Sequence, residues 1–241
     1  SNYILAGTVG ATSCTWFLTL WKTKARKMVY LGVVSSILIT YLSNSSGPIM
    51  SLFCLVIGLS AWPYRNNMKT IKSGIIVGLI VVQLFMNAPI WYLIGRIDLT
   101  GSSTGWHRAE LIDSAIRHLD EWWLFGTTYT RHWMPTGVSW SPNHTDITNQ
   151  YIKNGVWGGL ITMFLFIFMI SSSFGAIGRK IKEVGDKNRK HQVLLWILGA
   201  SLFSHTITFI SVRYFDQSIF YYYLLLALIG YATEEKTLVT K

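Results

Sequence analysis

Charged residues are scarce in this chain of 241 residues: Asp, Glu, Lys and Arg make up only 13% of it, whereas hydrophobic residues make up 51%. The mean hydropathy is +0.36. The apolar residues gather in blocks of about 17 to 23 residues, close to the ~20 residues that cross the hydrocarbon core of a bilayer. The sequence therefore predicts an all-α integral membrane protein and argues against a soluble domain.

Cysteine is also rare, and its placement argues against disulfide and zinc chemistry. Cys14 and Cys54 both lie inside apolar runs, without a His or Cys partner at the spacing of metal ligands. A disulfide framework or a zinc site needs such paired spacing. We expect both thiols to be packing residues, and we expect no metal site and no cofactor.

Acidic residues are fewer than basic ones. The chain has 11 Asp and Glu and 21 Lys and Arg, which gives a formal net charge of +10. The bases form short clusters beside apolar runs, at 22–27, 65–72 and 179–190. Such clusters are typical of the charges that orient membrane helices. We therefore expect no nucleic-acid partner.

Seven apolar runs are candidate membrane spans. They cover residues 3–21, 28–42, 48–62, 73–95, 152–174, 193–212 and 217–231. If these spans alternate in direction, the three basic loops and the C-terminal tail share one side, which is cytoplasmic by the excess of Lys and Arg. The expected order is four transmembrane helices in 1–95, a periplasmic loop at 96–151, three transmembrane helices in 152–232 and a cytoplasmic tail at 233–241.

The chain begins at Ser1, without an initiator Met and without a cleavable signal before the first span. We expect it to be the C-terminal part of a larger protein. The missing N-terminal transmembrane helices would then be partners of these spans, together with membrane lipids.

Polar residues are concentrated in 96–150, which holds four of the six His and five of the eleven Trp. Chemistry in a membrane protein needs water, charge and ordered backbone in one place, and a long loop outside the bilayer provides it. Any function is expected in this stretch.

Residues 106–123 have the period of an amphipathic helix. One face carries the apolar side chains Ala109, Leu111, Ile112, Ala115, Ile116, Leu119, Trp122 and Trp123. Ser103 or Thr104 can cap the start of this helix, and Gly126 can end it. We expect the helix to lie on the membrane surface or on the helix bundle.

Arg108 falls within the apolar arc of this helix and is predicted to point inward. A buried cation needs an anionic partner or several acceptors. One interpretation is that Arg108 reaches phospholipid headgroups or pairs with an acidic residue. The other is an anion site for a substrate phosphate, which the planar guanidinium can bind with two hydrogen bonds.

His144 lies a few residues before the fifth apolar run, at the expected water boundary, where an imidazole can exchange a proton. A structural, hydrogen-bonded histidine is the alternative. Asp146 and Asn149 can orient His144 or bind sugar hydroxyls, or they can cap the following helix. The tryptophans of the loop can stack on sugar rings or form an interfacial belt.

Several of these segments together resemble the O-antigen ligase and polymerase family of bacterial membrane glycosyltransferases. They are Gly-Ser-Ser-Thr-Gly-Trp-His-Arg-Ala-Glu at 101–110, Trp-Trp-Leu-Phe-Gly at 122–126, and His144 eleven residues before Gly155 with Gly-Gly-Leu at 158–160. Upstream, Leu-Ser-Asn-Ser-Ser-Gly-Pro at 42–48 is similar to the Ser-Arg-Gly turn of that family. The resemblance covers most of residues 40–175.

The resemblance implies an enzyme of the bacterial inner membrane, active in surface polysaccharide biosynthesis. Such an enzyme transfers a glycan from a polyprenyl-diphosphate carrier to a glycolipid, glycan or protein acceptor at the periplasmic face, without a metal or nucleotide. Catalysis would need a cation for the departing diphosphate and a base for the acceptor hydroxyl. The resemblance assigns Arg108 and His144 to these roles.

This sequence departs from the family pattern at three positions. Ser46 stands at the substrate-binding position where the family has Arg, and Arg96 at the outer end of the fourth span can supply a substitute charge. Lys153 stands where the family has Glu, and Thr145 stands where it has Asn. These changes indicate a divergent subgroup, and they leave open an inactive relative.

Two other classes of function remain as alternatives. In a transporter or flippase, Arg108, His144 and His205 would line a path for the solute. The sequence has no repeated half and no pair of Gly/Pro-broken helices, which argues against this class. A non-catalytic subunit of an envelope-assembly complex is the other alternative.

Overall fold

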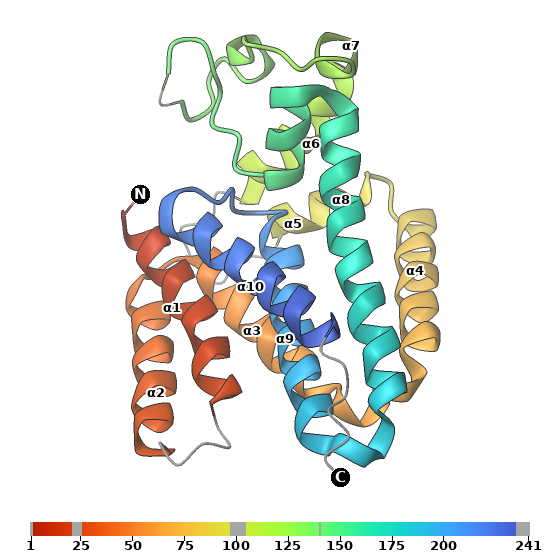
Figure 1. Cartoon of the computed structure of the whole chain (residues 1–241). Helices are drawn as coiled ribbons and strands as arrows, with labels where there is room; N and C mark the ends of the chain where they lie inside the picture. The colour runs from red at the N-terminus through yellow and green to blue at the C-terminus, as the bar shows by residue number, and fades with distance from the viewer. Residues whose placement is uncertain (1, 21–25, 97–104, 140, 235–241) are drawn as a thin grey trace. The chain divides into compact units, whose positions relative to one another are not determined.

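The computed structural model describes residues 2–20, 26–96, 105–139 and 141–234, and every regular element within these ranges is helical (Figure 1). The longer helices are α1 (Asn2–Thr19), α2 (Arg26–Leu42), α3 (Ser46–Ser60), α4 (Met68–Phe85), α6 (Gly105–Arg117), α8 (Gln150–Val184), α9 (Arg189–Thr208) and α10 (Asp216–Glu234). Short helices are η1 (Trp62–Asn67), η2 (Ile90–Tyr92), α5 (Leu93–Arg96), α7 (Leu119–Trp122), η3 (Arg131–Trp133) and η4 (Gly185–Asn188). The predicted all-α class is confirmed.

Each of the seven predicted apolar runs overlaps a helix, but the structure does not support seven membrane spans. Within the described residues, two helices are long and apolar enough to cross a membrane, Trp62–Phe85 and Gln150–Val184. Helix α3 has 15 residues, which at ~1.5 Å per residue gives about 22 Å, less than the ~30 Å hydrocarbon core. Helix α1 is longer, but its buried threonines Thr8, Thr12 and Thr15 lower its hydropathy.

The chain divides into two compact units, which differ from the four expected segments. The first unit comprises residues 1–62, 167–209 and 214–241, and the second comprises 63–166 and 210–213. The polar loop, predicted as a region of its own, thus belongs to the same unit as α4 and the first part of α8. We call this second unit the loop module.

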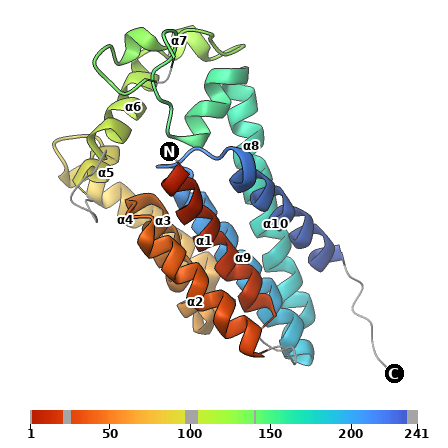
Figure 2. The same cartoon turned by 90° about the vertical axis from the view of Figure 1, so that its left-hand side faces the viewer.

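In the first unit, helices pack through small side chains. Helices α1 and α2 lie side by side (Figures 1 and 2), and the Thr40 hydroxyl donates to the Gly7 carbonyl at 3.3 Å. Between α3 and α9, the Ser51 and Ser204 hydroxyls are 2.9 Å apart. Small residues let helix backbones approach closely, which is the usual basis of helix packing in membranes. Cys14 and Cys54 are buried in this unit, as predicted for packing residues.

The core of the loop module joins α6, α7, η3 and the start of α8. Its buried members are Leu111, Ala115, Trp122, Trp133, Met134, Ile147, Ile152 and Val156. The predicted helix over 106–123 is not continuous, because the chain turns at His118 between α6 and α7. The turn brings the Trp122 indole back over α6, where its Nε1–H donates to the Ala115 carbonyl at 2.9 Å.

Helix α8 is broken near its start. The segment that follows α7 forms backbone hydrogen bonds with α8 at this break. Gly159 has φ 78°, outside the helical range, and Gly126 has φ 84°. The Thr127 amide donates to the Val156 carbonyl at 2.7 Å, and the Leu160 amide donates to the Trp123 carbonyl at 2.8 Å. These bonds satisfy backbone groups that the break leaves without helical partners. Residues 123–127 are thereby fixed against 156–160.

Candidate functional site

His144 is half-buried in the loop module, and its backbone is fixed on both sides. The fully buried Thr130 hydroxyl accepts from the Thr145 amide at 3.2 Å and lies 3.4 Å from His144 Nδ1. The Ser139 hydroxyl donates to the His144 carbonyl. The described hydrogen bonds of the ring involve Nδ1 alone, which leaves Nε2 to accept or release a proton.

Arg108 lies in the first turns of α6 and is half-buried, in agreement with the predicted inward direction. Its Nε is buried without a hydrogen-bond partner, and none of the salt bridges among the described residues includes it. Burial lowers the pKa of the Arg108 guanidinium. A partly desolvated cation whose Nε has no acceptor among the described residues is suited to an anionic ligand.

One hydrogen bond ties the helix that carries Arg108 to the segment that carries His144. His107 is buried, and its Nε2 lies 3.0 Å from the Asp146 carbonyl. The Asp146 amide in turn donates to the Val138 carbonyl at 2.8 Å. The neighbours of Arg108 and His144 are thus in contact, although no described hydrogen bond joins these two residues directly.

Asn149 caps α8, which was one of the three roles open to it. Its Oδ1 accepts from the amides of Tyr151 at 2.9 Å and Ile152 at 3.1 Å. Its Nδ2 donates to the Ile210 carbonyl at 3.1 Å. The buried amide therefore positions α8 and the 210–213 segment. Asp146 uses its backbone in the contacts described above, and no described bond directs its carboxylate at His144.

The two remaining site residues, Ser46 and Arg96, stay predictions. Ser46 begins α3 in the first unit, where it is half-buried. Arg96 ends α5, and its side chain lies outside the described residues, as do Ser103, Thr104 and Trp140. The substitute charge expected from Arg96 therefore stays a prediction.

The structure places two cations near the start of α8 that the sequence did not bring together. Lys153 and Arg213 lie close enough for their charges to repel each other. The Lys153 ammonium also lies 4.5 Å from the centre of the Trp157 ring. Two positive charges acting on the same region raise its local positive potential. Only the folding of 210–213 onto Asn149 produces this pair, because the residues are far apart in sequence.

The loop module also gathers three side chains of metal-binding type, His118, Glu121 and His132. Their ligand atoms all lie within 4.8 Å of one another. No metal site was predicted, because Cys14 and Cys54 lack partners at the spacing of metal ligands. This cluster contains neither cysteine. A signal for this cluster is the i, i+3 spacing of His118 and Glu121, which places both on one helical face.

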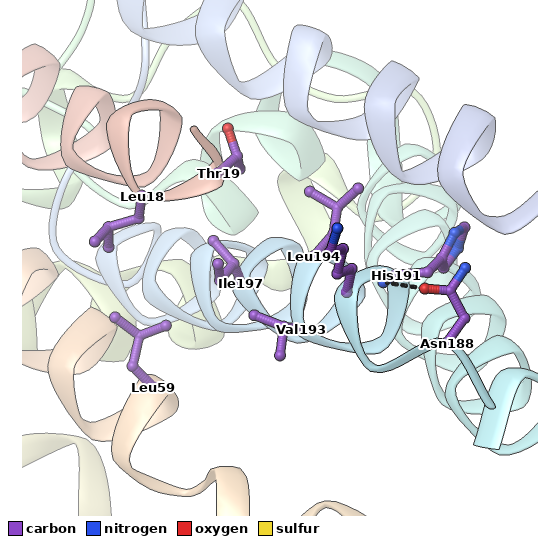
Figure 3. Close-up of a pocket in the computed structure, with 9 residues that line it drawn as sticks. Leu18, Thr19, Leu59, Asn188, His191, Val193, Leu194 and Ile197 are labelled. Atoms are coloured by element: carbon purple, nitrogen blue, oxygen red, sulfur yellow. Dashed lines mark hydrogen bonds between the residues drawn. The ribbon is translucent and has the colours of Figure 1, made fainter. Parts of the chain in front are cut away.

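A pocket of about 440 Å³ lies elsewhere, in the first unit (Figure 3). Its lining is mostly apolar, with Leu18, Leu59 and Ile197 among the side chains. At one end the His191 amide donates to the Asn188 side chain at 3.1 Å. The pocket contains neither Arg108 nor His144. His205, in the same unit, is buried and has its Nδ1 2.8 Å from the Tyr214 hydroxyl.

The described residues define an all-α protein with two helices long and apolar enough to cross a membrane and a polar segment between them in the sequence. Comparison with family models, with curated proteins and with solved structures gave no match.

Proposed function

We propose that this protein transfers a glycan from a polyprenyl-diphosphate carrier to a glycolipid, glycan or protein acceptor at the outer face of the membrane. The observation that carries the proposal is the His107 to Asp146 contact of 3.0 Å, which ties the helix bearing a desolvated arginine to the loop bearing an accessible imidazole. A transferase of this kind needs those two groups on either side of the reacting sugar.

The segments on which the family resemblance rests support the proposal by their contacts. The Leu160 amide of the segment at 158–160 donates to the Trp123 carbonyl of the segment at 122–126, and the Thr127 amide beside it donates to the Val156 carbonyl. A Cβ on Gly155 would meet the Trp122 ring at 2.3 Å, so Gly155 allows the indole to approach the helix. Motifs that are 30 residues apart in sequence thus form one packed unit, as parts of a common site would.

The proposed reaction exchanges one bond at the anomeric carbon for another. The acceptor hydroxyl attacks C1 of the donor sugar, the bond from C1 to the diphosphate oxygen breaks, and the hydroxyl proton passes to His144 Nε2. The diphosphate leaves with its electron pair and increased charge. Arg108 stabilises that charge with its guanidinium, and Lys153 and Arg213 add to the positive potential near the start of α8.

The proposal includes the membrane arrangement expected from the charges. All seven apolar helices cross the bilayer, and the loop at 96–151 faces the periplasm. Helix α4 supports this arrangement because none of its residues is buried, although its side chains are mostly apolar. Lipid or further helices would cover such a surface.

The test is glycan transfer by the full-length protein in proteoliposomes, with a synthetic polyprenyl-diphosphate oligosaccharide as donor. We expect His144→Ala to lower kcat by about 10²- to 10⁴-fold, the usual contribution of a general base. His191→Ala is the matched control, since that imidazole lies in the first unit. Wild-type turnover by His144→Ala would contradict the proposal.

The same preparation separates an enzyme from a flippase. A flippase would move the labelled donor across the membrane without forming a new glycosidic bond. We expect product formation when donor and acceptor are both on the side of the loop module, and no dependence on translocation. Translocation without product would favour the transporter class instead.

A further inference from the structure

The cluster of His118, Glu121 and His132 lies in the loop module, on residues to which the proposed glycan transfer assigns no role. His118 occupies the turn between α6 and α7, Glu121 lies in α7, and His132 lies in η3. Three separate elements therefore place one ligand group each at a common point. Two imidazoles and one carboxylate are a ligand set that binds zinc and related divalent transition ions.

The hydrogen bonds around His118 leave the correct nitrogen free for a metal. Its Nδ1 lies 2.9 Å from the Ser114 carbonyl, which can only accept a hydrogen bond, so Nδ1 carries the proton. Nε2 of the neutral ring then presents its lone pair. An imidazole that donates its other N–H to a backbone carbonyl is the usual arrangement around a bound metal.

Glu121 is oriented in a comparable way. The Trp133 indole N–H donates to Oε2 at 2.9 Å, while Oε1 lies 2.8 Å from His132 Nε2. One carboxylate oxygen is thus held by a neutral donor, and the other faces the imidazole. A metal ion can take the place of the proton shared between His132 and Glu121, because both atoms are ligands once that proton is released.

Both imidazole rings are further restrained by stacking. The Trp133 ring lies parallel to His118, with centroids 5.6 Å apart and 15° between the planes. The Tyr129 ring stacks on His132 at 5.1 Å and 10°. Restrained ligands lose little side-chain entropy on binding a metal. Glu121 and His132 are exposed, so water can complete the coordination.

We propose that His118, Glu121 and His132 form a binding site for a divalent transition ion of the zinc class, which fastens α7 to η3 in the loop module. The ion takes one nitrogen from each histidine and one oxygen from Glu121, with water in the fourth position, and the proton of His132 leaves to solvent. This site is distinct from the proposed glycan-transfer site and does not depend on it. Its role is to stabilise the polar loop by joining α7 to η3.

The experiment is a titration of the purified full chain in detergent, stripped with a chelator, with Zn²⁺ against a chromophoric competitor. We expect one saturable site per chain that is lost in Glu121→Gln and in His132→Ala. The matched control is His144→Ala, which removes an imidazole from the same module and should bind as the wild type does. A wild type without saturable binding, or variants with unchanged affinity, would overturn the proposal.

A gentler variant keeps the test valid if those replacements unfold the loop. Trp133→Phe retains the ring that packs on His118 but removes the donor to Glu121, and we expect a loss of about 10- to 100-fold in zinc affinity, as for other outer-shell partners. Co²⁺ gives a second readout, since its visible spectrum reports nitrogen and oxygen ligands. Spectra of wild type and Glu121→Gln that coincide would show that the carboxylate is not a ligand.

Discussion

At the scale of single residues, Arg108 combines a positive charge with partial burial and lacks a described hydrogen-bond partner for its Nε. If it binds diphosphate with two parallel hydrogen bonds, Arg108→Lys keeps the charge but loses the second bond. We expect kcat/KM for glycan transfer to fall by about 10- to 100-fold, the value of one or two charge-assisted bonds.

Arg117 provides the control for this substitution, because it lies on the same helix and is exposed, with Asp113 as its ion-pair partner. Arg117→Lys should leave kcat/KM within about twofold of wild type, since exposed pairs contribute little. Equal activity of Arg108→Lys and wild type would favour the lipid-headgroup interpretation of Arg108.

Glu121 gives a prediction about pH. Burial alone would raise the pKa of its carboxyl, but hydrogen bonds from Trp133 and His132 and the nearby imidazoles hold that pKa below its usual value. A lowered pKa in the folded state means that ionised Glu121 stabilises the fold above its unfolded pKa of about 4.3. That contribution is lost as the pH falls through the lower, folded value.

The measurement is thermal unfolding of the chelator-treated protein between pH 6 and pH 3. We expect wild type to be more stable than Glu121→Gln at pH 6, and the difference between them to shrink below about pH 4. A difference that stays constant over this range would show that the carboxylate charge contributes nothing to the fold.

At the scale of elements, the break in α8 gives a prediction about Gly159. Its φ of 78° is rare for residues with a Cβ, and a Cβ there would meet the Leu124 carbonyl oxygen at 2.1 Å. We expect Gly159→Ala to destabilise the loop module by about 1–3 kcal/mol and to raise hydrogen exchange at the Leu160 and Thr127 amides.

Gly178 is the matched control on the same helix. A Cβ at Gly178 would meet nothing within 4 Å, and Ala is favoured over Gly inside a helix by about 1 kcal/mol. Gly178→Ala should therefore be neutral or stabilising in the same thermal and exchange measurements. Similar losses in both variants would mean that the break at Gly159 is not required.

At the scale of the whole molecule, the prediction concerns the side of the membrane on which the loop module lies. Both native cysteines are buried, so a single introduced cysteine can report accessibility. Asn143 and Lys182 are exposed in the structure and lie on opposite expected sides. We expect Asn143→Cys to react with an impermeant maleimide in intact spheroplasts, and Lys182→Cys to react only after permeabilisation.

The reverse labelling pattern would place the loop at 96–151 in the cytoplasm and would remove the basis for transfer at the outer face. Labelling of both positions in sealed spheroplasts would mean that the chain between them does not cross the membrane. Either result would also contradict the orientation deduced from the Lys and Arg clusters.

The sequence by itself determined the helical class, because a continuous apolar run of about 20 residues can satisfy all its backbone groups internally as a helix. It also indicated the inward direction of Arg108, since the helical period fixes the direction of each side chain. Five of the apolar runs begin and end within four residues of a helix. The run at 73–95 continues past the end of α4 at Phe85, and the run at 152–174 stops before the end of α8 at Val184.

The tertiary structure alone decided which distant residues meet. The turn at His118 follows from the burial of Trp122 against Ala115, which no local pattern records. Lys153 comes near Arg213, and His132 comes near His118 and Glu121. Both arrangements depend on loops whose course is fixed by buried contacts and hydrogen bonds. A period along the chain gives the direction of a side chain, but only packing gives its partner.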